Sequence, residues 1–131
     1  MKILIASDLH GSSACIKKLM DRVDVEKPGQ IVLLGDILYH GPRNDLPSMY
    51  DTKESARLLN EKANIITSIK GNCDSEVDKM MLDFNIEAPH LILSIDGLNI
   101  LRLMVMYIIH HICQQYHHLI YCFMDIHTSL V

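Results

Sequence analysis

Three short apolar runs organise the first seventy residues of the chain, and each is followed by a polar stretch. They cover residues 3–6, 31–34 and 64–69 and are rich in β-branched and aliphatic side chains. Such runs predict strands that are buried on both faces, as in a parallel sheet covered by helices. Between them, apolar residues recur at helical spacing over about 13–24 and from Thr52 to Ala63, and this spacing predicts two helices.

The pattern continues with a third helix and a pair of strands. The helix is expected to begin behind Asp74 or Ser75 and to run to Phe84. Residues 91–95 and 98–101 predict two strands joined by a tight turn. Strands that alternate with helices, followed by a hairpin, predict a layered α/β fold.

Side chains that can bind a metal follow all three of the first strands. Asp8 and His10 come after the first strand, Asp36 after the second, and Asn72 after the third. Open α/β sheets bind ligands at the carboxyl ends of their strands, where carboxylates and imidazoles can share an ion. Each motif alone is more typical of a turn or a helix cap than of a metal site. Their repetition at three strand ends favours one shared site.

The motifs D-x-H, G-D and G-N-C-D, in this order, resemble those of the calcineurin-like metallophosphoesterases. The longer strings GDILYHGPRN and GNCDSEVDKM look like the small bacterial YfcE-type phosphodiesterases of that family. The resemblance covers about residues 1–100. It implies a metallophosphoesterase-type αββα sandwich, truncated here and followed by a segment that does not match the family. It also implies hydrolysis of a small phosphate ester by two divalent ions, with Mn²⁺ as the expected metal.

The resemblance assigns a role to each metal ligand. Asp8 and His10 would bind one ion, Asp36 would bridge the two ions, and Asn72 would bind the second ion through its amide oxygen. An amide oxygen coordinates without adding negative charge near an anionic substrate. Asn72 is also a residue type that is common in turns after glycine.

Three further residues are candidates for contact with the substrate. Cys73 stands where many family members carry a histidine that protonates the leaving group. A thiol does this less readily than an imidazole, which suggests substrates with activated leaving groups. His40 and Arg43 could contact the phosphate, although solvated loop residues are an equally good interpretation. Asp74 is assigned to capping the third helix.

Charge and cysteine content exclude several classes of protein. The formal net charge is −4 and the pI is near 6.0, so neither nucleic acid nor a membrane surface is expected as a partner. No signal peptide precedes the first strand, which favours a cytoplasmic protein. The cysteines show no zinc-type spacing and are expected to be reduced thiols. A homo-oligomer is left open.

The segment 101–131 has an unusual composition for a folded domain. It contains no Gly, Pro, Lys, Glu, Ala or Asn but holds five of the eight histidines, and the family's later Gly-His and Gly-His-x-His motifs are absent. Its adjacent histidine pairs are a poor metal motif, because neighbours do not share a helix face. Residues 1–100 are therefore interpreted as the metallophosphoesterase domain and 101–131 as an aberrant tail.

A shifted reading frame explains this tail. When the third base of each codon is joined to the first two bases of the next, Met104 with Val105 must give glycine, and so must Met124 with Asp125. The codons after the second glycine then permit Gly-His-Thr-His. Without the later histidines the two-metal phosphodiesterase activity is expected to be impaired. The alternative function is a non-catalytic scaffold for protein interactions on the same fold, which would predict loss of the first ligands as well.

Overall fold

The computed structural model describes residues 2–42, 45–95, 98–103 and 119–123. Its elements are β1 (Ile3–Ser7), α1 (Ser13–Glu26), β2 (Gln30–Leu33), α2 (Thr52–Asn60), a short 3₁₀ helix (Ala63–Ile65), β3 (Ile66–Ser68), α3 (Glu76–Met81), β4 (His90–Ile95), β5 (Leu98–Leu103) and β6 (Leu119–Phe123).

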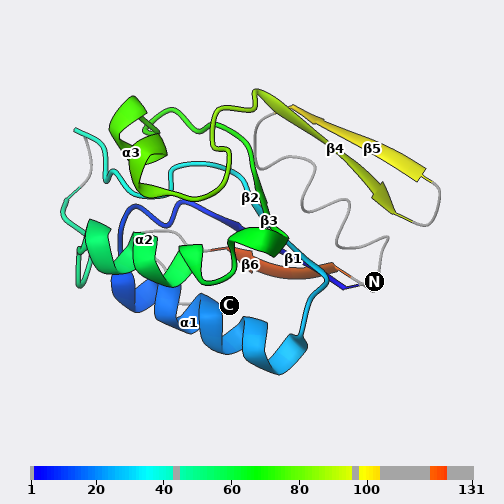
Figure 1. The fold of residues 1–131 in the computed structure, drawn as a ribbon, viewed down its shortest axis with the longest axis horizontal. Helices are drawn as coiled ribbons and strands as arrows, with labels where there is room; N and C mark the ends of the chain where they lie inside the picture. The colour runs from blue at the N-terminus through cyan, green and yellow to red at the C-terminus, as the bar shows by residue number, and fades with distance from the viewer. Residues whose placement is uncertain (1, 43–44, 96–97, 104–118, 124–131) are drawn as a thin grey trace.

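Four of these strands form a parallel sheet with the order β3-β2-β1-β6. Strands β4 and β5 pair with each other in an antiparallel second sheet, as the hairpin pattern predicted. Helices α1 and α2 lie along one face of the larger sheet, whereas β4 and β5 lie beyond its other face (Figure 1). The predicted layered α/β fold is therefore confirmed, and the described residues supply one outer helical layer and the two sheets.

Side chains on both faces of β1 and β2 are buried, as the continuous apolar runs predicted. On the helical face, Leu4 and Ile31 pack in the main core with Ile16 and Leu59 of the two helices. On the opposite face, a smaller cluster formed by Ile3, Ile5 and Val32 contacts Leu34 and Leu91. Because β1 lies between β2 and β6, the loop that follows it emerges near the middle of the sheet edge.

The first two helices begin where the sequence indicated. The Ser12 side chain accepts a hydrogen bond from the backbone N of Cys15 and caps α1, and Asp51 does the same for α2 through the backbone N of Glu54. Among the described residues, no helix has the length and apolar character needed to cross a membrane.

The prediction for the third helix was wrong at its carboxyl end. Helix α3 ends at Met81 rather than Phe84, because the chain becomes extended at Leu82. Asn60 holds this turn: its side-chain amide donates to the Met81 carbonyl (3.0 Å), and its amide oxygen accepts from the backbone N of Asp83 (2.9 Å). Leu82 and Ile86 then enter the main core.

Part of the segment interpreted as an aberrant tail has a partner in the sheet. Strand β6 pairs in parallel with β1, from Ile3 opposite Leu119 to Ser7 opposite Phe123. Residues 119–123 of this segment therefore take part in the sheet, and the interpretation of 101–131 as an aberrant tail stays a prediction. A five-residue run with this apolar content can fill an open sheet edge next to a buried strand, whatever the reading frame that produced it.

Candidate metal centre

The loops that follow β1 and β2 run side by side and hydrogen-bond to each other through their backbones. Asp8 N donates to the Gly35 carbonyl (3.3 Å), His10 N to the Asp36 carbonyl (2.9 Å), and Gly11 N to the Ile37 carbonyl (2.9 Å). The pairing of the two strands thus continues past their ends, and it fixes the position of Asp36 relative to the first loop.

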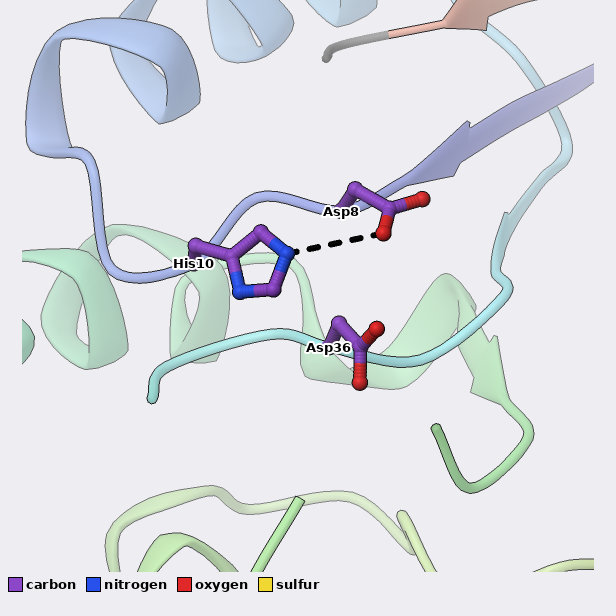
Figure 2. Close-up of side chains that lie close together, drawn as sticks. All are labelled: Asp8, His10 and Asp36. Atoms are coloured by element: carbon purple, nitrogen blue, oxygen red, sulfur yellow. Dashed lines mark ion pairs between the residues drawn. The ribbon is translucent and has the colours of Figure 1, made fainter. Parts of the chain in front are cut away.

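Asp8, His10 and Asp36 meet at this edge of the sheet. One ligand atom from each lies within 4.8 Å of the others, and all three side chains face a common point (Figure 2). His10 is 3% exposed and Asp36 is 9% exposed, whereas the Asp8 side chain is 33% exposed. The structure therefore brings together three of the four predicted metal ligands in a site that solvent reaches from the Asp8 side.

A backbone carbonyl orients the imidazole of His10. Its Nδ1 donates to the carbonyl oxygen of Tyr39 at 2.8 Å, so Nδ1 carries the proton in the neutral ring. The other nitrogen, Nε2, faces Oδ1 of Asp8 at 3.5 Å (Figure 2). A lone pair and a carboxylate oxygen at this distance repel each other unless a proton or a cation lies between them.

The charges in the site shift the pKa of each group. Burial opposes the charged forms of Asp8 and His10, but several contacts together outweigh it. The pKa of Asp8 is lowered by the hydrogen bonds with protonated His10 and with Ser7, and the pKa of His10 is raised by the hydrogen bonds with Asp8 and the Tyr39 carbonyl. Burial raises the pKa of Asp36, and the carboxylates of Asp8 and Asp74 raise it further against the hydrogen bond from Cys73. A bound cation would relieve the repulsion between these carboxylates.

The backbone at all three residues is left-handed, which non-glycine residues seldom adopt. The φ angles are 57° at Asp8, 47° at His10 and 55° at Asp36. Aspartate tolerates this region better than most residues, yet three such positions in one site indicate that the surrounding hydrogen bonds hold the ligands in place.

The loop after β3 joins the site through Asp36. The backbone N of Cys73 donates to Oδ1 of Asp36 at 2.8 Å. Asn72, the fourth predicted ligand, is exposed in this loop, and its side-chain nitrogen donates to Sγ of Cys73 at 3.4 Å. Asn72 thus precedes a residue whose backbone is hydrogen-bonded to Asp36, and its own side chain is exposed to solvent.

Asp74 does not cap the third helix, contrary to the sequence prediction. Ser75 caps it, in a reciprocal capping box with Asp78. Asp74 is 7% exposed, and its carboxylate accepts from the backbone N of Asp36 (2.9 Å), Ile37 (2.9 Å) and Gly71 (2.7 Å). This carboxylate joins the loops after β2 and β3. The S-x-x-D pattern at Ser75 was the sequence signal that could have freed Asp74 for this role.

Gly71 was also missed as a functional residue. A Cβ at this position would overlap the carboxylate and the backbone N of Asp36, and one at Gly35 would overlap the Gly71 backbone. The two loops therefore approach each other as closely as glycine allows.

Of the three candidates for substrate contact, His40 and Cys73 lie in the described loops and Arg43 does not. The ring of His40 lies edge-on between those of Tyr39 and Tyr50, with centroid distances of 5.0 and 5.1 Å. Burial raises the pKa of the Cys73 thiol, and the carboxylates of Asp36 and Asp74 raise it further. Arg43 lies outside the described residues.

The donor atoms fit a divalent ion of hard or borderline character. Carboxylate oxygens and an imidazole nitrogen bind such ions at about 2.0–2.2 Å, so ligands on opposite sides of one ion lie about 4 Å apart. The observed limit of 4.8 Å is close to that spacing. The fixed Nδ1 donor of His10 leaves Nε2 as its coordinating atom, which matches the usual support of metal-bound histidines.

Comparison with known proteins extends these observations. Phosphodiesterase YfcE of Escherichia coli strain K12 is 45% identical over 89 residues, covering 68% of this chain and 48% of the relative, and YfcE of strain O157:H7 gives the same values. The chain spans about half the length of these curated relatives. A solved structure of Yfce, described as a phosphoesterase from E. coli, matches 82% of this chain and 59% of its own, with a TM-score of 0.77 and 37% identity.

This structural match shows that the α/β architecture is the metallophosphoesterase fold. The family model described as calcineurin-like phosphoesterase matches residues 1–121, which include all three strand-end motifs. The chain therefore belongs to the calcineurin-like phosphoesterase family.

Proposed function

We propose that this chain carries the first metal-binding half of a phosphodiesterase site that hydrolyses small phosphate esters. The observation that carries the proposal is the convergence of Asp8, His10 and Asp36 on one point, with the imidazole oriented by a backbone carbonyl. The names of the relatives, phosphodiesterase and phosphoesterase, support the same reaction.

Each ligand has a separate task in this proposal. Asp8 and His10 would hold one ion. Asp36 could contribute to both ions, because it lies between the loop of Asp8 and the loop that carries Asn72. The amide oxygen of Asn72 would complete the second position after a side-chain rotation, which its exposure permits. When bound, divalent ions, with Mn²⁺ proposed as the physiological one, neutralise the phosphate and lower the pKa of a bound water.

The remaining candidates act on the phosphate rather than on the ions. Cys73 is adjacent to Asn72 and its backbone is bonded to Asp36, so its thiol is within reach of a substrate bound at the metal ligands. His40 and Arg43 belong to the loop after β2, and we propose that they contact the phosphate or its ester groups. The cytoplasmic location and the absence of nucleic-acid and membrane partners stay predictions from the sequence.

An assay of the purified chain with Mn²⁺ and an activated aryl phosphodiester tests this function. We expect slow, metal-dependent turnover, because each ion lacks the later histidine ligands of the family. Asp36→Asn should abolish it, since this substitution removes the carboxylate proposed to bind both ions. Asp83→Asn is the matched control, since Asp83 is exposed and lies outside the site. Turnover that survives Asp36→Asn would contradict the site, and binding of neither metal nor ester would favour the scaffold alternative.

A further inference from the structure

A pocket is formed partly by the loops that carry the candidate metal ligands. Its volume is 330 Å³, in the range of small-molecule sites, and its apolar wall is formed by Tyr39, Tyr50, Val77 and Met81. The loop after β2, the first turn of α2 and helix α3 supply its lining, and these segments lie at the same end of the molecule (Figure 1). Two aromatic rings, a branched aliphatic side chain and a thioether form a surface that suits a flat apolar group.

The polar wall of the pocket excludes a second phosphate. It consists of Thr52, Ser75 and Asp78, so the residues that line the pocket include one acid and no base. The Asp78 carboxylate accepts from the backbone N of Ser75 at 3.1 Å and is 7% exposed. An anionic group would be repelled by this carboxylate, and no lining residue offers a compensating cation. An uncharged ring would meet no such repulsion.

Short chain connections place the pocket next to the metal ligands. The carbonyl of Tyr39 accepts the hydrogen bond that orients His10, so one residue both supports a ligand and lines the pocket. Tyr39 also follows Asp36 by three residues, which limits their Cα separation to about 11 Å. Ser75 follows Cys73 by two residues and α3 begins directly after it, so the opposite wall is tied to the third loop of the site.

We propose that this pocket binds an aromatic ring carried on one ester oxygen of the substrate phosphate. The inference rests on the proposed function and adds to it a substrate class: phosphate esters with an uncharged aryl or heteroaryl arm. Tyr39 and Tyr50 contact the ring, Val77 closes its outer side, and the phosphate lies toward Asp8, His10 and Asp36.

Two exposed apolar side chains close in sequence to lining residues do not line the pocket. Met49 is 61% exposed and Met80 is 86% exposed, compared with 64% for Val77 in the lining. Met80 and Val77 lie on the same helix, so they form a matched pair for substitution. Val77→Asp introduces a charge into the lining of the pocket, and Met80→Asp introduces the same charge on the same helix outside the lining.

Titrations followed by ¹H–¹⁵N NMR, with Mg²⁺ present, test the proposal without requiring turnover. The probes are phenyl phosphate, methyl phosphate and phenol. We expect phenyl phosphate to bind about tenfold more tightly than methyl phosphate, because it buries apolar surface that methyl phosphate lacks. Val77→Asp should remove this advantage and Met80→Asp should keep it. Equal affinity of the two esters in the unmodified chain, or equal effects of the two variants, would overturn the proposal.

The same titrations separate this inference from the proposed function. If the metal site fails, Mg²⁺ with methyl phosphate will not shift the amides of Asp8, His10 and Asp36, and phenyl phosphate will show no advantage over phenol. If the pocket fails, methyl phosphate will shift those amides and phenol will leave Val77 and Asp78 unchanged. Sedimentation is the control for self-association, and an oligomer that Val77→Asp dissociates would assign the pocket to a subunit interface instead.

Discussion

Replacement of Asp74 by asparagine should weaken metal binding although no proposed ligand is replaced. In the structure one carboxylate oxygen, Oδ2, accepts from the backbone N of both Asp36 and Gly71, and Oδ1 accepts from Ile37. An asparagine can keep two of these bonds through its single oxygen. Its NH₂ group must then face one of the backbone N–H groups, so a donor meets a donor.

The expected cost follows from these contacts. A hydrogen bond to a charged group contributes about 1.5–3 kcal/mol, and a buried donor left without an acceptor costs about 1–3 kcal/mol. Asp74→Asn should therefore lower the free energy of unfolding by roughly 2–3 kcal/mol, and Asp74→Ala, which loses all three bonds, by roughly 3–5 kcal/mol. A domain of this size has about 5–15 kcal/mol in total, so the asparagine variant is the one expected to stay folded.

Two measurements check this prediction. Urea unfolding gives the stability, and calorimetric titration with Mn²⁺ gives the metal affinity, which we expect to fall about 10- to 100-fold because the backbone of Asp36 is no longer held. Asp83→Asn makes the same chemical change at an exposed position and should alter neither value. If Asp74→Asn behaves like Asp83→Asn in both experiments, Asp74 does not position Asp36 and this reasoning is refuted.

Two other predictions concern the loop after β3 and the unusual tail. Gly71→Ala should weaken Mn²⁺ binding by at least about tenfold while Gly29→Ala leaves it unchanged, because a Cβ at Gly71 overlaps the Asp36 carboxylate; equal calorimetric affinities for the two variants would contradict this. Sequencing of the source DNA should show that the frame offset from residues 103–131 encodes a Gly-His-x-His motif that starts with the glycine forced at Met124 and Asp125. An offset frame without such a motif would reject the frameshift.

Strands β1 to β5 and the first two helices could be predicted in type and order because local apolar spacing determines them. The ends were less accurate: α2 stops at Asn60 rather than Ala63, and a 3₁₀ helix over Ala63–Ile65 delays β3 to Ile66. In α1 the residues with helical spacing, among them Ile16, Leu19 and Val23, are the ones that are buried. The convergence of the three candidate ligands was predictable for a related reason, since parallel strands end at one edge of the sheet. Asp8, His10 and Asp36 needed no knowledge of distant contacts.

The errors have a common cause in contacts between segments far apart in the chain. The end of α3 depends on Asn60, which lies 21 residues before Met81 and hydrogen-bonds its carbonyl. The role of Asp74 depends on Asp36, 38 residues earlier. Likewise, the pairing of β6 with β1 is a choice of sheet edge that no local pattern specifies.

The central claim, that Asp8, His10 and Asp36 bind a divalent ion, is tested most directly by paramagnetic broadening. When Mn²⁺ is added below one equivalent, amide signals of the loops after β1, β2 and β3 should broaden first in a ¹H–¹⁵N spectrum. Asp36→Asn should abolish this focus, and Asp83→Asn should preserve it. Broadening centred on other acidic positions, such as Asp21 and Asp24 of α1, or a pattern unchanged by Asp36→Asn, would contradict the claim.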